Sequence, residues 1–457
     1  MARNIFTTAE ILLPGEGVAP EAWSVIACDQ FSSEREYWER VRLGAGDRPS
    51  TLNMIIPEAY LDGIDEEKEI EKISGAMAEY AKSGVLREIK DSLIYVERTQ
   101  SDGQVRKGLV GAVDLEEYEF SGGDAAILAS EGTALDRLPP RIRIRRAASL
   151  ELPHIMTFIA DKNDTVFKPL SLKSGNLPVL YDFELAEGGG HLRGMQVSGA
   201  DAEEVLAALR TLHEGNIADG SQCLMIMGDG NHSLAAAKAY WDEIKQGMDA
   251  AGRESHPARR ALLEVNNVFD PAITFQAIHR VVFEVDADDF IAGFVKAVQA
   301  ETVAGPETGP EAEAKAETKA GPETGPKTET GTGRGCAGEP TVSYNLRLIS
   351  ASADQSAALS HGITVSAGCI GDMIAAVQTF IDEYISTAGG KVDYIHDEEA
   401  AKRLASGGNC VSIILPAMEK SDFFNTVAAR GIFPRKAFSV GHARDKRYYM
   451  ECRGIKS

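Results

Sequence analysis

The sequence predicts an α+β fold, in which helices flank a mixed sheet. Three observations lead to this prediction: amphipathic helical stripes, short apolar runs bounded by glycine, and a pair of extended segments around Asp102-Gly103. With 457 residues, of which 44% are apolar, the chain is long enough for two or three packed domains.

Residues 65–113 predict a helix followed by a hairpin. In "DEEKEIEKISGAMAEYA" four apolar residues recur at helical spacing: Ile70, Ile73, Met77 and Tyr80. The stretch "LIYVERTQSDGQVRKGLVGAV" holds two extended runs joined through Asp102-Gly103, which is a strong hairpin signal. A helix next to a hairpin is typical of a mixed α and β protein.

Residues 223–248 predict a buried strand that leads into a helix. The run "CLMIMG" is too short for a helix and ends on glycine, so it favours a strand. The helix behind it has an apolar stripe made of Leu234, Ala237, Trp241, Ile244 and Met248. The C-terminal part repeats both patterns, with a helix predicted at 369–385 and a buried strand at 410–417.

Residues 301–340 differ from the rest in composition. "AGPETGP" occurs there twice, and almost no residue is large and apolar. Such a segment buries too little surface to offset its ordering entropy, so we expect disorder, as a repeat-expanded linker or as an interaction tail.

Four parts are therefore expected along the chain. They are an N-terminal α/β part (1–120), a core (121–300), a disordered low-complexity insertion that acts as a linker (301–340), and a C-terminal α/β part that completes the fold (341–457).

The charge of the chain limits its partners. Forty-seven basic residues against 69 acidic ones give a net charge of -22, which repels nucleic acid and anionic membranes. We expect a small-molecule substrate, no nucleic acid and no membrane, and a homo-oligomer is left open. The N-terminus lacks a signal-peptide pattern and no apolar run reaches about 18 residues, so we expect a cytoplasmic protein.

The turn "GDGNHS" (228–233) is the main candidate site. A strand that enters a helix through such a turn points free backbone N–H groups at one spot, where the helix dipole also attracts an anion. Gly228 and Gly230 permit close approach of a ligand, and Asp229 is a candidate Mg²⁺ ligand. Three further residues are candidate phosphate donors: Asn231, His232 and Ser233. In the alternative interpretation, Asn231 or Ser233 caps the helix and Asp229 only shapes the turn.

Several segments resemble, in order, a prokaryotic family catalogued as domain of unknown function 1015. "MGDGNHSLAAA" and "VNNVFDPAITFQAIHRVV" are similar to its Asp-Gly-His-His-Arg and Pro-or-Ala-Ile-His-Arg segments. "SEGTALDRLPPRIRIRR" resembles its His-Glu-x-Thr segment, "DYIHDEEAAKRLASGG" its Tyr-x-His-Asp segment, and "GIFPRKAFS" its Met-Pro-x-Lys-Ser segment. The resemblance covers nearly the whole chain outside 301–340.

The Asp-Gly-His-His-Arg segment is in turn similar to one in the free-serine kinases, which share a fold with ParB and sulfiredoxin. The resemblance implies a ParB/sulfiredoxin-like nucleotide-binding core, ATP or ADP with Mg²⁺, and a glutamate that acts as base. The sequence departs from the motif twice, with Asn231 for the first His and Ser233 for the Arg. The second replacement removes a cation able to bind phosphate through two hydrogen bonds.

Phosphoryl transfer to a hydroxyl needs a carboxylate that accepts the hydroxyl proton. Glu131 is the first candidate, because it matches the acidic residue of the His-Glu-x-Thr segment, and Thr133 beside it is a candidate phosphate or metal contact. Asp29, which aligns with a Pro-Tyr-Asp segment of the family, is the second, and His232 is a third candidate catalytic group. The alternatives are a surface carboxylate for Glu131 and a turn or cap residue for Asp29.

The family resemblance also implies cations that line the site. His279 and Arg280 are candidates, or else form a buried structural pair, and Lys436 is a candidate to neutralise phosphate. The densest basic cluster near the C-terminus lies in "GHARDKRYY" (441–449). It either binds an anion or forms a solvated strand edge, and we expect the solvated strand edge. Asp397 is expected to cap a helix.

Three function classes follow. The first is a nucleotide-dependent phosphotransferase that acts on a small hydroxylated metabolite such as free L-serine. The second is a catalytically silent nucleotide-binding switch of the ParB type; the negative charge counts against the DNA binding that such a switch would include. The third is a metal-dependent hydrolase built on Asp229, His232, Glu131 and His279. The sequence contains no metal-ligand motif such as H-E-x-x-H that would support it.

Overall fold

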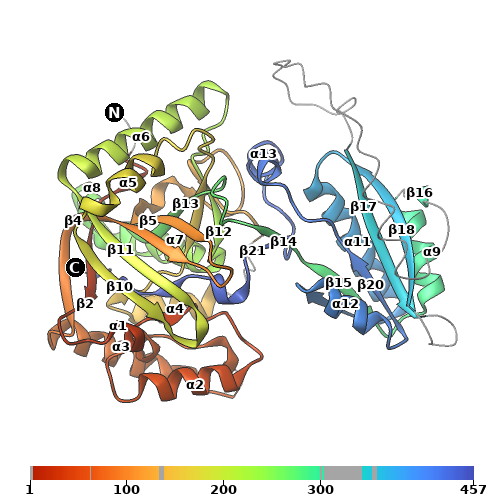
Figure 1. The fold of residues 1–457 in the computed structure, drawn as a ribbon, viewed down its shortest axis with the longest axis horizontal. Helices are drawn as coiled ribbons and strands as arrows, with labels where there is room; N and C mark the ends of the chain where they lie inside the picture. Colours follow the sequence, from red (N-terminus) through yellow and green to blue (C-terminus); the bar gives the residue numbers. More distant parts are fainter. Residues whose placement is uncertain are drawn as a thin grey trace. The chain divides into compact units, whose positions relative to one another are not determined.

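The computed structural model describes residues 4–61, 63–132, 138–298, 301–302, 342–351 and 358–456. The chain divides into two compact units (Figure 1). The first comprises residues 1–274, 427–435 and 440–457, and the second comprises 275–426 and 436–439. The boundary at 274/275 lies inside the segment 121–300, which the sequence patterns placed in one part. A strand pair, β14 (Phe275–Ala277) with β21 (Phe438–Val440), lies near this boundary in the chain.

The first unit is built on an 11-stranded mixed sheet. Nine strands follow one another in the order β10-β11-β4-β5-β13-β9-β12-β7-β6, and β1 and β2 pair with β5 and β4. Their bounds are β1 Phe6–Thr7, β2 Ala9–Pro14, β4 Leu86–Thr99, β5 Val105–Asp114, β6 Tyr118–Glu119, β7 Ile127–Leu128, β9 Met156–Ile159, β10 Val179–Leu185, β11 Gly190–Ser198, β12 Met225–Asp229 and β13 Arg260–Asn267. Two short pairs complete the unit, β3 (Val25–Ile26) with β22 (Tyr448–Tyr449) and β8 (Leu150–Glu151) with β23 (Arg453–Gly454).

Both faces of this sheet are buried, because apolar residues occupy both sides of its central strands. In β4, Leu93 and Tyr95 belong to one core cluster, whereas Ile94 and Val96 belong to the other. The first cluster includes residues of α5 (Phe167–Lys173), α6 (Gly199–Ala218) and α7 (Asn231–Ile244); the second includes residues of α1 (Pro20–Trp23), α2 (Arg35–Ala45) and α3 (Glu66–Lys82). The remaining helices of the unit are α4 (Leu138–Ala147) and α8 (Ala250–Ser255).

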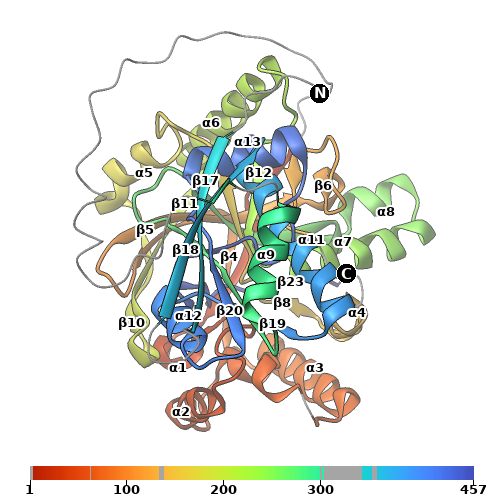
Figure 2. The same ribbon diagram turned by 90° about the vertical axis from the view of Figure 1, so that its right-hand side faces the viewer.

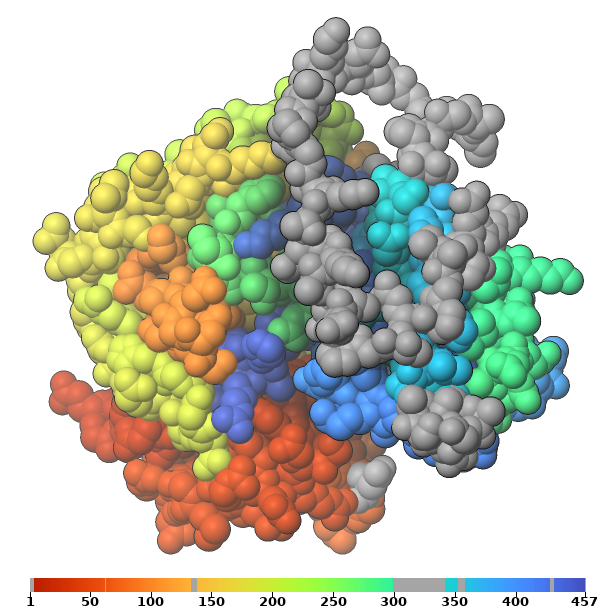
Figure 3. Space-filling view, turned by 45° about the vertical axis from the view of Figure 1, so that its right-hand side comes forward, coloured from red at the N-terminus to blue at the C-terminus, as the bar shows by residue number. Residues whose placement is uncertain are grey.

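The C-terminal segment of the chain is part of this first unit. Cys452 pairs with Leu12, and Tyr449 and Tyr448 pair with Val25 and Ile26. Figure 3 shows C-terminal residues, in blue, at the surface beside yellow-green residues. The buried Tyr448 donates its hydroxyl to the carbonyl of Ala186, between β10 and β11. The C-terminal segment therefore pairs with β3 and with Leu12 of β2, near the N-terminus.

The second unit has a six-stranded sheet in the order β16-β18-β17-β20-β15-β19. These strands are β15 His279–Phe283, β16 Glu301–Thr302, β17 Val342–Ala351, β18 Ala358–Ala367, β19 Lys391–Ile395 and β20 Cys410–Ile414. Helices α9 (Ala287–Ala297) and α11 (Ile370–Ala388) lie side by side (Figures 1 and 2), joined by aromatic contacts such as Phe290 with Phe380. Helix α12 (Glu398–Ala405) packs on β20 through a separate core cluster, and α13 (Lys420–Arg430) contains the boundary at 426/427.

The predicted elements are confirmed in their type. The helix predicted at 65–81 is α3, capped by the side chain of Asp65, and the Asp102-Gly103 hairpin joins β4 to β5. The strand at 223–228 is β12, and the helix behind it is α7, which ends at Ile244, before Met248. The protein is a mixed α/β fold with a large mixed sheet and flanking helices, as expected. Residues 303–340 of the predicted insertion lie outside the described residues.

Two further properties bear on the expectations from composition. Among the described residues, no helix is long and apolar enough to cross a membrane. The five cysteines in the described part of the chain are free thiols.

Candidate functional site

The turn 228–233 connects β12 to α7 in the first unit. Gly230 is the residue before the helix and adopts a left-handed conformation, with φ of 79° and ψ of 24°. Gly230, the N-cap residue, has no side chain with which to cap the helix. The N–H groups of Ser233 and Leu234 donate to the carbonyl of Gly230, and the N–H of Gly230 donates to the carboxylate of Asp229. The positive end of the helix dipole lies at this turn and favours an anion there.

Both glycines of the turn are required by their surroundings. A Cβ atom on Gly230 would lie 3.1 Å from Cα of Ile155, and its positive φ disfavours any residue with a side chain. Gly228 lies where the pairing of β12 with β9 shifts register, and a Cβ there would collide with the ring of Phe158. The turn therefore packs directly against the 155–158 segment.

Asn231 connects the turn to the segment that carries Glu131. Its side-chain oxygen accepts the backbone N–H of Ser130 at 3.2 Å, and its Nδ2 donates to the Ser130 hydroxyl at 3.2 Å. Ser130 is fully buried. This pairing places Glu131 one residue from a direct partner of the turn. Both polar atoms of the Asn231 amide are bonded to Ser130.

A third segment joins at the same place. The carbonyl of Ser130 accepts the N–H of Phe433 at 2.7 Å, the N–H of Gly132 donates to the carbonyl of Phe433 at 3.2 Å, and Glu131 forms a parallel bridge with Phe433. Three sequence segments that are far apart in the chain, around 131, 231 and 433, thus meet at the α7 N-terminus. Thr133, the predicted neighbour of Glu131, lies outside the described residues.

Asp229 is paired with a lysine. Nζ of Lys446 lies 3.1 Å from Oδ2 of Asp229, and the other carboxylate oxygen accepts the N–H of Gly230 at 2.9 Å. Burial alone would raise the pKa of Asp229, but the charge of Lys446, the charge that His154 carries when protonated, and the two hydrogen bonds outweigh it and hold the pKa below its ordinary value. Asp229 is therefore ionised at neutral pH.

Ser233, at the end of the same turn, lies next to His154. Its hydroxyl is 3.3 Å from Nε2 of His154, and Nδ1 of His154 is 2.9 Å from the hydroxyl of Tyr449, which accepts the N–H of Cys28 at 3.2 Å. Burial raises the pKa of Tyr449 well above its usual value, so this hydroxyl keeps its proton. Both hydrogen bonds of His154 form when Tyr449 donates to Nδ1 and Nε2 donates to the Ser233 oxygen. The hydroxyl proton of Ser233 is then available to another acceptor.

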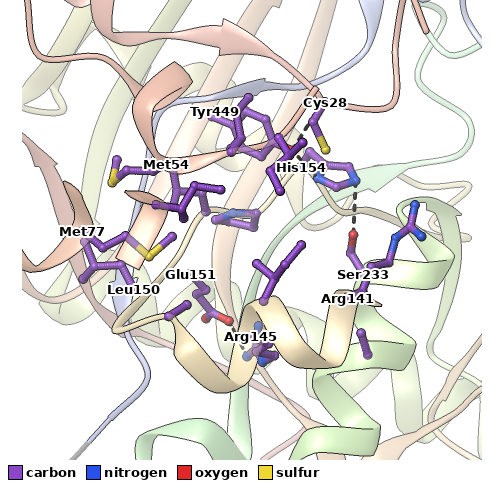
Figure 4. A pocket seen from close by; sticks show the side chains of 18 of the residues that line it. Cys28, Met54, Met77, Arg141, Arg145, Leu150, Glu151, His154, Ser233 and Tyr449 are labelled. Carbon is purple, nitrogen blue, oxygen red and sulfur yellow. Dashed lines mark hydrogen bonds and ion pairs between the residues drawn. The ribbon is translucent and has the colours of Figure 1, made fainter. Parts of the chain in front are cut away.

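A cavity of about 210 Å³ opens beside Ser233 (Figure 4). Ser233, Cys28, His154 and Arg141 lie at one side of it, and Met54, Met77 and Leu150 lie at the other (Figure 4). Arg141 forms an ion pair with Glu58, with Nη2 and Oε1 2.5 Å apart. All the residues that line the cavity belong to the first unit.

Asp29 is half-buried and follows Cys28, which lines the cavity. Its carboxylate accepts a hydrogen bond from Gln30 at 3.1 Å. Burial, together with the charge of Asp29, raises the pKa of the Cys28 thiol to about 12. The thiol therefore stays protonated at neutral pH and is a poor nucleophile.

A buried ion network holds Lys446 and His154 in place. Arg447 binds Glu264 at 2.8 Å and Glu451 at 2.5 Å and also donates to the carbonyl of Pro153, the residue before His154. Burial would raise the pKa of Glu264, but the charges of Arg106 and Arg447 hold it below its ordinary value. Because Arg447 lies between Lys446 and the Tyr448–Tyr449 strand, this network positions both partners of the turn.

Comparison with protein families identifies the chain. Residues 12–333 match the family described as "Protein of unknown function (DUF1015)". The chain belongs to this family. No curated protein matches the DUF1015 chain.

Several solved structures resemble the DUF1015 chain, each with a TM-score below 0.4. A conserved hypothetical protein from Pyrococcus furiosus is 14% identical, with 76% of this chain and 94% of that chain covered and a TM-score of 0.34. A free serine kinase in complex with AMP is 13% identical, with 76% and 90% covered and a TM-score of 0.36. SbnI from Staphylococcus aureus, truncated at its C-terminus, is 9% identical, with 73% and 82% covered and a TM-score of 0.33.

Three candidate cations of the DUF1015 motif series belong to the second unit. Nδ1 of His279 accepts the N–H of Leu415 at 3.2 Å, and burial lowers the pKa of His279. Arg280 is fully buried, lies over the ring of Tyr394 and donates to the carbonyl of Ile278. Lys436 is exposed, with φ of 60°. The side chain of Asp397 caps α12, as predicted.

The prediction for the C-terminal basic cluster was wrong for half of its residues. His442 and Arg444 are exposed, but Lys446 and Arg447 are buried, at 8% and 4% exposure, because the carboxylates of Asp229 and Glu264 bind them. The apolar run Tyr448-Tyr449-Met450 that follows is the signal that indicates burial. His154 was not predicted, since nothing in its local sequence marks it. His232, half-buried on α7, stays a candidate.

Proposed function

We propose that this DUF1015 protein is a nucleotide-dependent phosphotransferase that uses ATP or ADP and acts on a small hydroxylated metabolite. One observation carries the proposal. The N-terminus of α7, entered through a left-handed glycine, is flanked by Asp229, which pairs with the buried Lys446, and by Ser233, which lies next to His154. Helix N–H groups, a lysine and a hydroxyl are the donors that phosphate oxygens need.

In this proposal the phosphates lie against the first turn of α7. The positive end of the α7 dipole attracts the phosphate oxygens, and Lys446 neutralises part of their charge. Ser233 donates its hydroxyl proton to the same anion, because His154 supplies a donor to its oxygen. Lys446 and the Ser233–His154 pair thus compensate for the cation that the family motif has at position 233.

Asp229 does not fit the role of a magnesium ligand in this arrangement. Both of its oxygens already accept hydrogen bonds, and Nζ of Lys446 lies 3.1 Å from Oδ2, where a metal ion would be. We therefore assign the charge compensation at Asp229 to Lys446 and derive no step through a metal at this carboxylate.

Two carboxylates, Glu131 and Asp29, are candidates for the base. Glu131 follows Ser130, which binds Asn231, and Asp29 follows Cys28, which lines the cavity. In the reaction, the acceptor oxygen forms a bond to the terminal phosphorus, the bond between that phosphorus and the bridging oxygen breaks, and the acceptor proton moves to the carboxylate. We assign this role to Glu131, on its match to the family segment. His232, on the first turn of α7, contributes to the phosphate site.

The acceptor is proposed from the motif resemblance alone, which favours free L-serine. A ParB/sulfiredoxin-like core is part of the same proposal.

Two other functions are supported less well than the phosphotransferase. A metal-dependent hydrolase needs a group of ligands, and no cluster of three His, Cys, Asp or Glu side chains occurs among the described residues. A silent nucleotide-binding switch uses the same turn and differs only in lacking turnover.

Phosphorus NMR tests the proposal. The purified protein is incubated with magnesium and ATP or ADP, with and without L-serine and a panel of other hydroxylated metabolites. A new phosphoester signal that requires both protein and acceptor supports the phosphotransferase. Broadening of the nucleotide signals without product supports the switch instead, and unchanged signals in every sample reject a nucleotide site.

A further inference from the structure

The cavity beside Ser233 has two chemically distinct ends. Polar groups gather at the α7 end, where Ser233, His154 and Tyr449 form their hydrogen-bonded series. The other end is walled by apolar side chains from the 54–56 segment, α3, α4 and β8: Met54, Ile56, Ile73, Met77, Ile144 and Leu150. A ligand that fills the cavity therefore has a polar group at one end and an apolar body at the other.

The charged residues near the apolar end are already paired with protein groups. Nη2 of Arg145 lies 2.7 Å from Oε2 of Glu151, while Oε1 of Glu151 binds Arg453 at 2.7 Å and accepts the N–H of Leu262 at 2.9 Å. Both oxygens of this buried carboxylate are therefore occupied (Figure 4 shows the bond to Arg145). A ligand at this end is held by apolar contact and not by hydrogen bonds to Glu151.

Position connects the cavity to the phosphate turn. Ser233 belongs to the first turn of α7, where the phosphates are proposed to bind, and it also lines the cavity, as does Ala236 one turn further on. A molecule with its phosphates at the α7 N-terminus and its remaining part directed along α7 would enter the cavity past Ser233.

We propose that this cavity holds the base of the nucleotide whose phosphates bind at the α7 N-terminus. The inference rests on the proposed function. A nucleoside base has two broad apolar faces and is joined through ribose to charged phosphates, which matches an apolar cavity that begins at a phosphate turn. Free serine matches it poorly, because its ammonium and carboxylate groups need charged partners, whereas Arg145 and Glu151 bind each other.

The same geometry predicts how bases are distinguished. Contact with apolar walls scales with buried area, so purine nucleotides bind more tightly than pyrimidine nucleotides. Adenine and guanine differ in the polar groups on their edges. Nη2 of Arg145 and both oxygens of Glu151 are paired, and the buried Nε of Arg145, which has no protein partner, can donate to N7, an acceptor that both purines carry. ATP and GTP therefore bind with similar affinity, and CTP binds more weakly than either.

Titration calorimetry on the full chain tests the proposal with four probes: ATP, GTP, CTP and inorganic tripolyphosphate, which carries phosphates without a base. Ile144→Trp fills the cavity, and Leu172→Trp, at a residue that is 80% exposed on α5 and outside the cavity, is the matched control. The expected result is a loss of ATP affinity of about tenfold or more in Ile144→Trp, with tripolyphosphate affinity unchanged and no effect of Leu172→Trp.

The outcomes separate this inference from the function on which it rests. If wild type binds ATP and tripolyphosphate equally well, and Ile144→Trp binds ATP as wild type does, the base lies elsewhere and only the inference falls. If wild type binds neither, the proposed function falls and the inference falls with it. If Ile144→Trp loses both ligands, Ile144→Ala decides: weaker ATP binding alone supports the base site, and unchanged ATP binding overturns it.

Discussion

Nζ of Lys446 lies 3.1 Å from Oδ2 of Asp229, although 217 positions separate the two residues in the chain. The lysine comes from the C-terminal segment and the aspartate from the end of β12. Their side chains are 10% and 19% exposed, so the pair is largely removed from water. The electrostatics of the phosphate turn therefore depend on the last residues of the chain.

Replacement of Lys446 by methionine tests this pair. The change leaves Asp229 with a largely buried, uncompensated charge beside the proposed phosphate site, so we expect a destabilisation of about 1–3 kcal/mol and at least about a tenfold loss of ATP affinity. Urea unfolding and calorimetry measure the two effects. Lys446→Arg restores most of the binding. Lys245→Met, at the other end of α7 and paired with Asp242 and Glu116, is the control that leaves ATP affinity unchanged.

Gly230→Ala tests the conformation of the turn. The φ of 79° and the Cβ contact with Ile155 make alanine unfavourable here, so we expect a loss of about 1 kcal/mol or more of stability and weaker nucleotide binding. Gly247→Ala is the matched control, because a Cβ there meets no atom within 4 Å and φ is not positive. Equal effects of the two substitutions would mean that the left-handed turn is not required.

The pH dependence of stability tests the network around Glu264. The pKa of Glu264 is lowered by folding from an ordinary value of 4.5, so its contribution is fully present above pH 4.5 and is lost as the pH falls through the folded-state pKa. We expect Glu264→Gln to cost about 3–5 kcal/mol at pH 7, and this difference from wild type to shrink below pH 4.5.

Tryptophan fluorescence during urea unfolding is suited to this measurement, because Trp23, Trp38 and Trp241 all belong to the first unit. Glu243→Gln is the control, since the ion pair of Glu243 with Arg146 is half exposed and contributes about 0–1 kcal/mol. A Glu264→Gln difference that stays constant from pH 7 to pH 3 would contradict the assignment.

Cys28→Ala distinguishes the proposed chemistry from thiol catalysis. With a pKa of about 12, the Cys28 thiol carries almost no thiolate at neutral pH, so we expect turnover within about twofold of wild type. The rate of phosphoester formation is the measurement, and a loss of a hundredfold would identify the thiol as a nucleophile.

Local sequence patterns predicted the turn because its cause is local. The apolar run 223–228 and the stripe of α7 follow from strand and helix periodicity, and glycine alone suits the left-handed position at 230. The meeting of Ser130, Asn231 and Phe433 was predicted only in outline, through the family segments that contain them.

The partners of the turn were missed because long-range packing selects them. Lys446 lies in a run of charged residues, and such a composition predicts exposure to solvent. Its burial depends on Asp229 and on the Arg447 network. His154 has no periodic or motif signal around it, and it reaches Ser233 only because the 155–158 segment packs against the turn. Tertiary contacts of this kind leave no mark on local periodicity.

The last prediction concerns the base. If the nucleoside occupies the cavity on the Asp29 side, the acceptor approaches from the side of Ser130, which binds Asn231 and precedes Glu131. Glu131→Gln then keeps ATP affinity but lowers kcat by about a hundredfold or more, because a positioned base contributes on this scale. Asp29→Asn, the matched control on the cavity side, keeps kcat within a few-fold. The reverse result would assign the base to Asp29 and the cavity to the acceptor, since a base must lie next to the hydroxyl that it deprotonates.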